Sequence, residues 1–314
     1  MYIRSIGHYF PSEIVPNSYF TDSFGLSHEW LLERTGIVER RKATSDENTH
    51  TLAICAVQAL FEKHQINPQE VDLIVGATYT PFDLIVTLGH AIQHQWNIED
   101  IPVVTISSAC SSLLNAMEIV EGYFAMGKAK TALVVAAEHN TAYYNPTDTK
   151  SNHLWGDGAS ALYVTQEQQT DSSLKIIDLK TGGAGTVGKA MEGVMLRPNH
   201  GGINMPHGRD VFIHACTYMA KATREILAKN HSTVEDVSWF IPHQANRRIT
   251  RNVARELGLS EERIVSNIQY LGNTGSAGCG IGLSEIWDKI NPKDLIVMTV
   301  FGGGYSWGAM LLEG

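Results

Sequence analysis

One cysteine of this chain stands where nucleophilic chemistry is favoured. Cys110 follows an apolar, β-branched run at 103–106 and the small residues at 107–109, and it precedes apolar residues at helical spacing. This pattern predicts a buried strand, a tight turn and a helix that begins near the thiol. Unpaired N–H groups and the positive end of the helix dipole favour a thiolate there, which is one way to activate a nucleophile. The alternative is a small buried apolar side chain, the usual role of a free cysteine.

The second half of the chain supplies three further candidates. A predicted strand at 239–242 ends at His243, where a side chain would face a cleft, although a structural histidine is the alternative. Asn273 lies in a Gly-Asn-Thr-Gly turn, which conformational preference alone could explain. Three glycines at 302–304 let the backbone approach a ligand closely and offer an N–H to an oxyanion, but they also suit an ordinary tight connection.

The elements that must position these residues occur twice along the chain. A helix, turn and strand around Val71 recur around Val237, 166 residues later (237 − 71 = 166). In each half the strand leads to a helix, a short strand with a small-residue turn, another helix and two apolar strands. These segments are 86–95, 107–110, 131–137 and 159–164 in the first half, and 244–257, 272–278, 294–301 and 307–312 in the second. Any α/β chain alternates in this way, but agreement over so many elements favours a duplicated α/β unit.

The duplication predicts the domain organisation. Alternating strands and helices indicate mostly parallel sheets covered by helices. We expect an N-terminal half at 1–170 that carries Cys110 and a C-terminal half at 171–314 that carries His243 and Asn273. The active groups should meet at strand ends near the join of the two halves.

Composition narrows the functional classes. The hydrophobic content of 43 % and charged content of 18 % suit a well-packed globular protein. A net charge of −9 argues against a general nucleic-acid binder. The four cysteines form no CxxC pair, and we expect a reduced, cytoplasmic protein with no signal peptide and no membrane segment. His90 and His94 have the spacing of metal ligands, but no carboxylate cluster accompanies them, so we expect no metal site.

Taken together, these motifs resemble the β-ketoacyl-acyl carrier protein synthase III branch of the thiolase superfamily. The resemblance rests on the Cys110 segment, the Pro-His-Gln-Ala-Asn run at 242–246, the Asn273 turn and the glycine run, in that order. It also includes Trp30 with Arg34-Thr-Gly-Ile, and Trp155-Gly-Asp-Gly-Ala, so that it covers essentially the whole chain. It implies a thiolase-like α/β fold, with duplicated βαβαβαββ halves in a layered α-β-α-β-α arrangement.

The resemblance implies catalytic roles for the candidates. Cys110 would take an acyl group from a coenzyme A or carrier-protein thioester. His243 and Asn273 would donate hydrogen bonds to a malonyl-type or β-ketoacyl thioester and stabilise its enolate, which attacks the acyl group on Cys110. The backbone N–H groups of Cys110 and Gly304 would bind the oxyanion of the acyl-transfer step. No cofactor is implied, because coenzyme A and phosphopantetheine enter only as thioester substrates.

The resemblance also implies binding positions. Four residues would contact the substrate or the coenzyme A arm: Trp30, Arg34, Ile85 and Phe212. In the helix after His243, Arg247, Arg251 and Arg255 share one face with Arg248 beside them, a pattern that alone suits a solvated surface. On an acidic chain the resemblance makes this basic face a docking site for the acidic acyl carrier protein. A homodimer is implied as well.

Three departures from the family pattern suggest a specialised enzyme. Ser111 and Ser112 follow Cys110 where Ala-Gly is usual, Ile85 stands where an aromatic residue often reaches the partner subunit's acyl pocket, and 141–154 lacks the usual arginine. A ketosynthase of dialkylresorcinol formation, which joins a β-ketoacyl thioester to a second acyl chain, fits these departures.

Several alternatives stay open at the level of sequence. They are the housekeeping initiation of fatty-acid synthesis, an acyltransferase that makes esters or amides, a non-catalytic partner subunit and a Cys–His thioesterase. The sequence leaves open the acyl chain lengths, the acceptor, the carrier that delivers each substrate and whether the product is linear or cyclised.

Overall fold

The computed structural model describes residues 1–145 and 147–314, which build one nine-stranded sheet and two small ones. Five strands of the large sheet belong to the first half, in the spatial order β5-β4-β6-β7-β1, and four belong to the second, in the order β11-β12-β13-β8. The two halves of the sheet join where β1 pairs with β8 over two residue pairs, Tyr2 with Lys175 and Ile3 with Leu174. The strands are β1 (Tyr2–Tyr9), β4 (Ile74–Ala77), β5 (Val103–Ile106), β6 (Thr131–Glu138), β7 (Gly158–Thr165), β8 (Leu174–Gly183), β11 (Val237–Pro242), β12 (Leu295–Phe301) and β13 (Ser306–Glu313).

The two halves repeat the same pairing pattern. The pairs β4–β6 and β11–β12 are parallel, whereas β6–β7 and β12–β13 are antiparallel, and so are β7–β1 and β13–β8. The spacing of 166 residues also relates the 3₁₀ turns Pro68–Glu70 and Val234–Asp236 (234 − 68 = 166). It relates the first residues of helices α5 (Ser112–Ala125) and α10 (Gly278–Ile286) as well (278 − 112 = 166). This repetition supports the predicted duplication, while a division at residue 170 remains a prediction.

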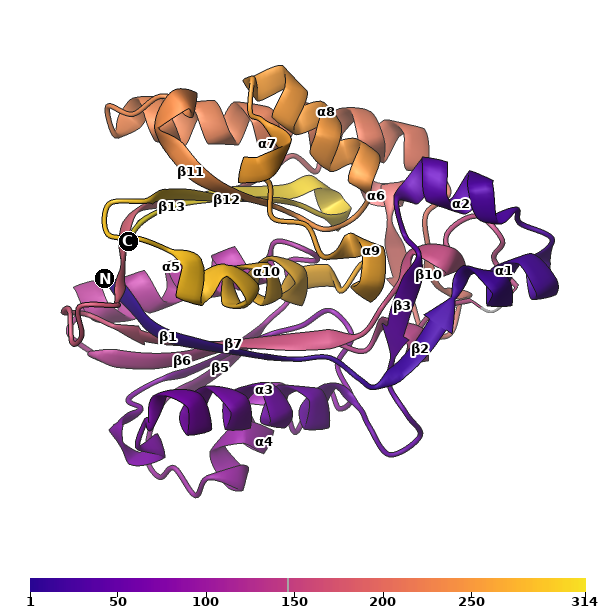
Figure 1. Ribbon diagram of the computed structural model, residues 1–314. Coiled ribbons are helices and arrows are strands. Elements are labelled where there is room, and N and C mark those ends of the chain that lie inside the picture. Colours follow the sequence, from indigo (N-terminus) through magenta and orange to yellow (C-terminus); the bar gives the residue numbers. More distant parts are fainter. Residues whose placement is uncertain (146) are drawn as a thin grey trace.

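Helices cover both halves of the large sheet and fill the space between them, as Figure 1 shows. Helices α5 and α10 lie in the middle layer, where Met117, Leu283 and other fully buried side chains form a core with both halves of the sheet. Helices α3 (Thr49–His64) and α4 (Leu88–Gln95) cover the outer face of the first half. Helices α7 (Gly208–Lys229) and α8 (Arg247–Leu257) cover the outer face of the second. The layered α-β-α-β-α arrangement expected from the sequence is confirmed.

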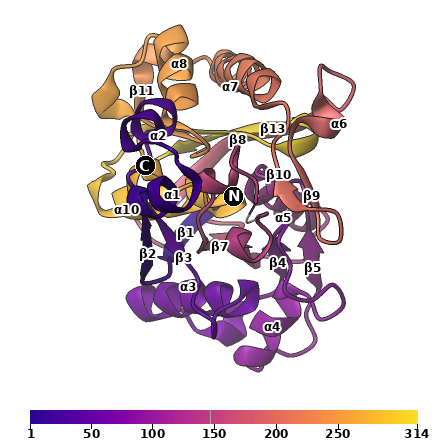
Figure 2. The same cartoon turned by 90° about the vertical axis from the view of Figure 1, so that its right-hand side faces the viewer.

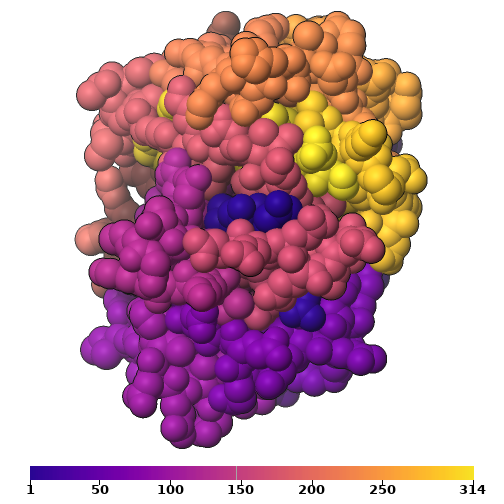
Figure 3. Space-filling model, turned by 90° about the vertical axis from the view of Figure 1, so that its left-hand side faces the viewer, coloured from indigo at the N-terminus to yellow at the C-terminus, as the bar shows by residue number. Residues whose placement is uncertain are grey.

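Apolar side chains on both faces of the strands explain why the sheets are covered on both sides. All residues of β4, β7 and β12 are buried, which is typical of strands between two helical layers. Figure 3 shows the halves stacked one above the other, with the N-terminal strand between them. No helix of the described residues is long and apolar enough to cross a membrane.

Small elements gather on the side of the molecule seen in Figure 2. They include α1 (Asn17–Phe24), α2 (His28–Thr35), α6 (Ala190–Gly193) and α9 (Ile268–Leu271). Two small sheets lie there too, one of β2 (Glu13–Pro16) with β3 (Glu39–Lys42) and one of β9 (Met195–Arg197) with β10 (Gly202–Asn204). The short strand expected before the Asn273 turn is reduced to one parallel bridge, between Phe240 and Ile264.

Candidate active site

A strained turn after β5 presents Cys110. Ala109 has a φ of +49°, a left-handed conformation that is uncommon for a residue with a side chain. The hydroxyl of Ser112, which follows Cys110, holds the turn that precedes it. Ser112 Oγ accepts the Ser108 N–H at 2.7 Å and donates to the Ala109 carbonyl at 2.6 Å. The helix α5 begins at Ser112, two residues after Cys110. Such a turn fixes the thiol at the carboxyl end of a strand and before the first turn of a helix.

The environment keeps the thiol protonated. Cys110 is 8 % exposed, and burial, with the nearby Glu138 carboxylate, raises the pKa of its thiol to about 12. Hydrogen bonding from Tyr79 and from backbone groups lowers the pKa only in part. The expectation that the helix terminus favours a thiolate is therefore wrong for the resting protein, because desolvation outweighs the helix terminus.

The glycine run after β12 lies against the cysteine. A Cβ added to Gly302 would come within 2.6 Å of the Cys110 nitrogen, so only glycine permits this approach. Ser306 ties the run to the turn of Cys110, because its hydroxyl donates to the Ser108 carbonyl at 2.8 Å. Hydrogen bonding by the Gly303 backbone lowers the pKa of Cys110, whereas Gly304 is exposed, with a φ of +65°. The structure thus brings Gly303 to the thiol in place of Gly304, a difference of one residue from the sequence-based prediction.

His243 lies directly after β11, beside the strand that leads to the glycine run. Its backbone N–H donates to the Thr299 carbonyl of β12 at 2.8 Å, which holds the strand end. The side chain is buried, and its Nδ1 has no hydrogen-bond partner among the described residues. Burial lowers the pKa of His243 to about 4. The imidazole is therefore neutral at neutral pH and acts as a hydrogen-bonding group without a charge.

Asn273 is held rigidly in the turn before α10. Its N–H donates to the Leu154 carbonyl at 2.8 Å, and its carbonyl accepts from Gly156 at 3.0 Å, so the turn is pinned to the segment before β7. Its Oδ1 accepts the Gly275 N–H at 3.0 Å. Because Oδ1 is used inside the turn, the amide nitrogen is the end of the side chain that remains to donate.

Glu138 is a buried residue that the sequence reasoning missed. It ends β6, is fully buried, and accepts hydrogen bonds from Thr80 Oγ1 at 2.5 Å and from Thr78 Oγ1 at 3.1 Å. Ser276, from the second half, also donates its hydroxyl to this carboxylate. Burial raises the pKa of Glu138 to about 7. A lone carboxylate at the carboxyl end of an otherwise apolar strand is the signal that could have identified it.

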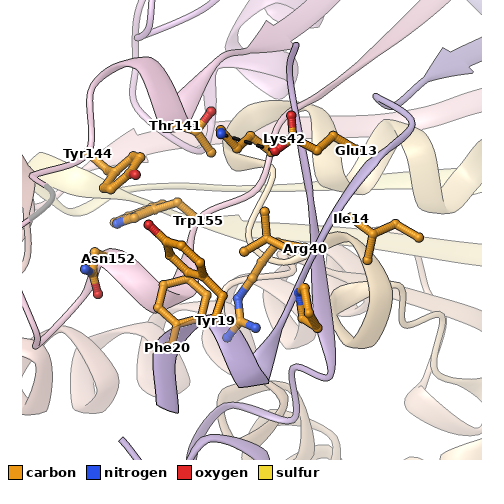
Figure 4. A pocket seen from close by; sticks show the side chains of 12 residues that line it. Glu13, Ile14, Tyr19, Phe20, Arg40, Lys42, Thr141, Tyr144, Asn152 and Trp155 are labelled. Atoms are coloured by element: carbon orange, nitrogen blue, oxygen red, sulfur yellow. Dashed lines mark hydrogen bonds and ion pairs between the residues drawn. The ribbon is translucent and has the colours of Figure 1, made fainter. Parts of the chain in front are cut away.

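The cysteine opens onto a cavity of about 250 Å³. Its walls are mostly apolar, as a site for an acyl chain requires. The lining residues are Tyr79, Ser107, Ala109, Cys110, Trp155, Val194, Met195, Leu196, Ile203 and Gly303. Trp155 also lines a second cavity, of about 170 Å³, between α1, β2 and β3. Figure 4 shows that cavity, with the rings of Tyr19, Phe20 and Trp155 on one side and the ion pair of Glu13 with Lys42 on another.

The residues expected to bind the substrate arm lie apart from the buried site. Trp30 is 40 % exposed on α2, and its ring makes a T-shaped contact with the His153 ring. Arg34 is exposed one turn later. Phe212 is half-buried on α7, with the Arg248 guanidinium 5.8 Å from its ring centre. Ile85 is 85 % exposed and lines neither of these two cavities.

The arginines of α8 do not form one uniform face. Arg248, Arg251 and Arg255 are exposed, whereas Arg247 is half-buried with its side chain against Gly36. Arg251 pairs with Glu261 at 3.1 Å, and Arg255 donates to Asn252 Oδ1 at 2.5 Å. Arg248 pairs with no carboxylate among the described residues, so its charge is the most available to an acidic partner.

Comparison with known proteins agrees with this geometry. Residues 104–185 match the family model of 3-oxoacyl-[acyl-carrier-protein] synthase III, and residues 227–313 match the model of its C-terminal part. The chain is 35 % identical to the β-ketoacyl-[acyl-carrier-protein] synthase III of Clostridium perfringens, over 99 % of this chain and 98 % of that protein. It is also 35 % identical to the enzyme of that name from Aquifex aeolicus, over 99 % and 98 %.

Solved structures extend the similarity to the fold. The crystal structure of the Aquifex aeolicus synthase III superposes with a TM-score of 0.93 at 34 % identity, covering 100 % of this chain and 99 % of that one. The priming β-ketosynthase of the R1128 polyketide pathway gives a TM-score of 0.89 at 28 % identity, covering 99 % and 95 %. A tetronic acid condensing enzyme, at 20 % identity and a TM-score of 0.87, shares the fold.

Proposed function

The chain belongs to the β-ketoacyl-[acyl-carrier-protein] synthase III family, and on that premise we propose roles for its residues and a class of substrate. It is an acyltransferase of thiolase-like fold, a ketosynthase that catalyses a Claisen-type condensation. The observation that carries the residue assignments is the contact of the glycine run with the Cys110 turn beside one apolar cavity, whose Tyr79 packs against Gly275 of the Asn273 turn.

We propose that Cys110 is the nucleophile of the first half-reaction. Its sulfur attacks the carbonyl of an acyl thioester, and the oxyanion that forms is bound by the backbone N–H groups of Cys110 and Gly303. The close approach of Gly302 to the Cys110 nitrogen and the action of the Gly303 backbone on the thiol support this assignment over Gly304. The thiol proton leaves with the departing thiol, since the high pKa of Cys110 opposes a standing thiolate.

For the second half-reaction, His243 and Asn273 are the donors to the enolate. A malonyl-type thioester loses carbon dioxide, or a β-ketoacyl thioester loses its α-proton, and the enolate carbon attacks the acyl group on Cys110. The new carbon–carbon bond replaces the bond between the acyl carbon and the Cys110 sulfur. The released thiolate is reprotonated, by solvent on the malonyl route and by the equivalent of the lost α-proton on the β-ketoacyl route. Charge gathers on one enolate oxygen, and two fixed donors in a dry site stabilise it. The low pKa of His243 supports this role, because a neutral imidazole donates one N–H without first taking a proton. An ester- or amide-forming acyltransferase would be expected to lack the His or the Asn, and a non-catalytic subunit would be expected to lack the Cys. All three residues are present here.

The substrates we propose are carrier-bound and coenzyme A thioesters, with no bound cofactor. The names of the relatives refer to acyl carrier protein. Arg248 is exposed and forms no ion pair with a carboxylate of the described residues, which supports carrier docking on α8. Trp30 and Arg34 on α2 and Phe212 on α7 would contact the coenzyme A or phosphopantetheine arm. Ile85 would reach the acyl site of a second subunit, in a cytoplasmic homodimer.

A specialised condensation stays our proposal for the pathway. Serines occupy the two positions after Cys110, and the Ser112 hydroxyl holds the turn. The solved structures similar to this chain include a polyketide-priming ketosynthase. A dialkylresorcinol-type reaction would join a β-ketoacyl thioester to a second acyl chain. Incubation with two acyl thioesters, one of them a β-ketoacyl donor, should then yield a cyclic diketone or resorcinol precursor. Simple malonyl-dependent elongation as the sole reaction would favour fatty-acid initiation.

Intact mass after incubation with acyl thioesters tests the catalytic assignments. We expect the parent protein to gain one acyl group and Cys110→Ser to gain none. His243→Ala and Asn273→Ala should still become acylated but should condense about 100- to 1000-fold more slowly, since each removes one enolate donor. Undiminished acylation of Cys110→Ser would refute the nucleophile. Cys279→Ser, which changes the other buried cysteine, is the matched control and should be acylated normally.

A further inference from the structure

Tyr79 is a polar residue of the Cys110 cavity to which no role has been assigned. It lies just after β4 and lines the cavity together with Cys110 and Trp155. Its phenol hydroxyl donates to Asn140 Oδ1 at 2.8 Å, and its backbone N–H donates to the Glu138 carboxylate at 3.2 Å. Two buried groups of the first half therefore hold both ends of this residue.

The second half positions the hydroxyl from the other side. A Cβ added to Gly275 would lie 2.3 Å from the phenol oxygen, so this glycine leaves the space that the hydroxyl occupies. Gly275 also donates its N–H to Asn273 Oδ1, and Asn140 Nδ2 donates to the Asn273 carbonyl at 3.2 Å. The hydroxyl is thus fixed between Asn140 and the Asn273 turn, on the wall of the cavity that holds the thiol.

The chemistry of a phenol suits a donor at this place. Burial raises the pKa of Tyr79 well above its usual range, so the hydroxyl keeps its proton and is no base. The Tyr79 side chain acts on Cys110 by lowering the pKa of the thiol. A hydroxyl that donates to a sulfur stabilises negative charge on that sulfur, which the buried site otherwise disfavours.

We propose that Tyr79 is a catalytic residue whose hydroxyl donates a hydrogen bond to the Cys110 sulfur during acyl transfer. The proposal rests on the role of Cys110 as the nucleophile. A bond forms between the Cys110 sulfur and the acyl carbon, and the bond from that carbon to the sulfur of the incoming thioester breaks. The Cys110 proton ends on the departing thiol, while Tyr79 keeps its own proton throughout. No other reactant is needed, and the phenol exchanges its bond to Asn140 for one to the sulfur.

The test compares Tyr79→Phe with Tyr143→Phe. Tyr143 donates its hydroxyl to the Pro81 carbonyl, so the control removes a phenol that anchors the same loop without lining the cysteine cavity. Alkylation of Cys110 by iodoacetamide at pH 8, followed by intact mass, reports the thiolate fraction. We expect Tyr79→Phe to slow alkylation about tenfold, the effect of a pKa higher by about one unit. Acylation by an acyl thioester should slow about 10- to 100-fold, and Tyr143→Phe should match the parent in both rates.

A second variant covers the case in which Tyr79→Phe does not fold. Incorporation of 3-fluorotyrosine at position 79 keeps the ring and the hydroxyl but makes the phenol a stronger donor, so alkylation should become faster than in the parent. Unchanged alkylation in Tyr79→Phe, or in the fluorotyrosine protein, would overturn the role of Tyr79. Failure of the nucleophile assignment is distinguishable, because acylation of Cys110→Ser would then persist whatever stands at position 79.

Discussion

Burial determines the ionisation of the residues around Cys110. Burial raises the pKa of the Cys110 thiol to about 12 and lowers the pKa of the His243 imidazole to about 4, so neither group carries a charge at neutral pH. The resting site therefore differs from a thiolate–imidazolium pair. A buried, protonated thiol is a weak nucleophile until a thioester is bound and oriented against it, so it reacts slowly with other electrophiles.

Replacing Glu138 with Gln should make the thiol more reactive. The Glu138 carboxylate raises the pKa of Cys110, so a neutral amide should lower that pKa and speed alkylation at pH 8, by about tenfold for each unit. Glu118→Gln is the matched control, because this carboxylate of α5 accepts the Thr181 N–H of β8. An alkylation rate equal to that of the parent would show that the charge of Glu138 does not reach the thiol.

Glu138→Gln should also remove one source of pH dependence from the free energy of unfolding. The pKa of Glu138 in the folded protein is about 7, above its ordinary value of 4.5, so ionisation of this group opposes folding as the pH rises from 4.5 through 7.

His153→Leu should stabilise the protein in acid. His153 is buried, its Nδ1 has no partner among the described residues, and burial, with Arg40, lowers its pKa to about 4. Between pH 6.5 and 4 the unfolded chain binds a proton that the folded chain resists, so the parent loses stability as the pH falls. The free energy of unfolding of the variant, relative to that of the parent, should therefore rise by up to about 3 kcal/mol as the pH falls from 6.5 to 4. Urea denaturation at several pH values measures this, and a constant difference would contradict it.

Among the elements, α8 combines structural and docking roles. Ile249, Val253 and Leu257 pack into the core of the second half, while Arg248 is exposed on the opposite face. Its N-terminus is capped by Asn246, whose side chain accepts the Arg248 N–H at 2.8 Å. The helix therefore presents its free charge from a rigid base.

Reversing the charge of Arg248 should weaken the use of carrier-bound substrate. We expect Arg248→Glu to raise the KM for an acyl carrier protein thioester about tenfold, because an acidic partner then meets a negative charge. The KM for the matching coenzyme A thioester should change little. Lys221→Glu, on the exposed surface of α7, makes the same change of charge as a control. Equal effects on both substrates would argue against a docking role.

On the scale of the whole molecule, one loop exposes apolar side chains that a single chain leaves uncovered. Phe82, Leu84, Ile85 and Val86 are between 53 % and 85 % exposed, and the loop lies next to the strand end that carries Tyr79. A contiguous exposed apolar segment is typical of a protein interface. This supports the proposed homodimer.

Leu84→Glu should therefore weaken self-association. A charge buried in an apolar interface is costly, so the variant should sediment as a monomer at concentrations at which the parent is a dimer. Met191→Glu, at a residue 74 % exposed elsewhere, should sediment like the parent. A parent that is monomeric at every concentration would contradict the dimer, and a variant that stays dimeric would place the interface elsewhere.

The sequence by itself determined the features that depend on neighbouring residues. The spacing of 166 residues, the strand–turn–helix at Cys110 and the turns at His243 and Asn273 follow from local hydrophobic patterns and turn preferences, which near neighbours set. The resemblance of these motifs to the synthase III family also came from sequence alone.

The tertiary structure decided the properties that depend on distant residues. The contact of Ser276 with Glu138 joins residues 138 apart, and the fit of Gly275 against Tyr79 joins the two halves. Burial reversed the expected ionisation of Cys110, and the path of the chain after β12 brought Gly303, one residue earlier than expected, to the thiol. Desolvation and close approach depend on which surfaces the fold packs together, and no local pattern around Cys110 contains that information.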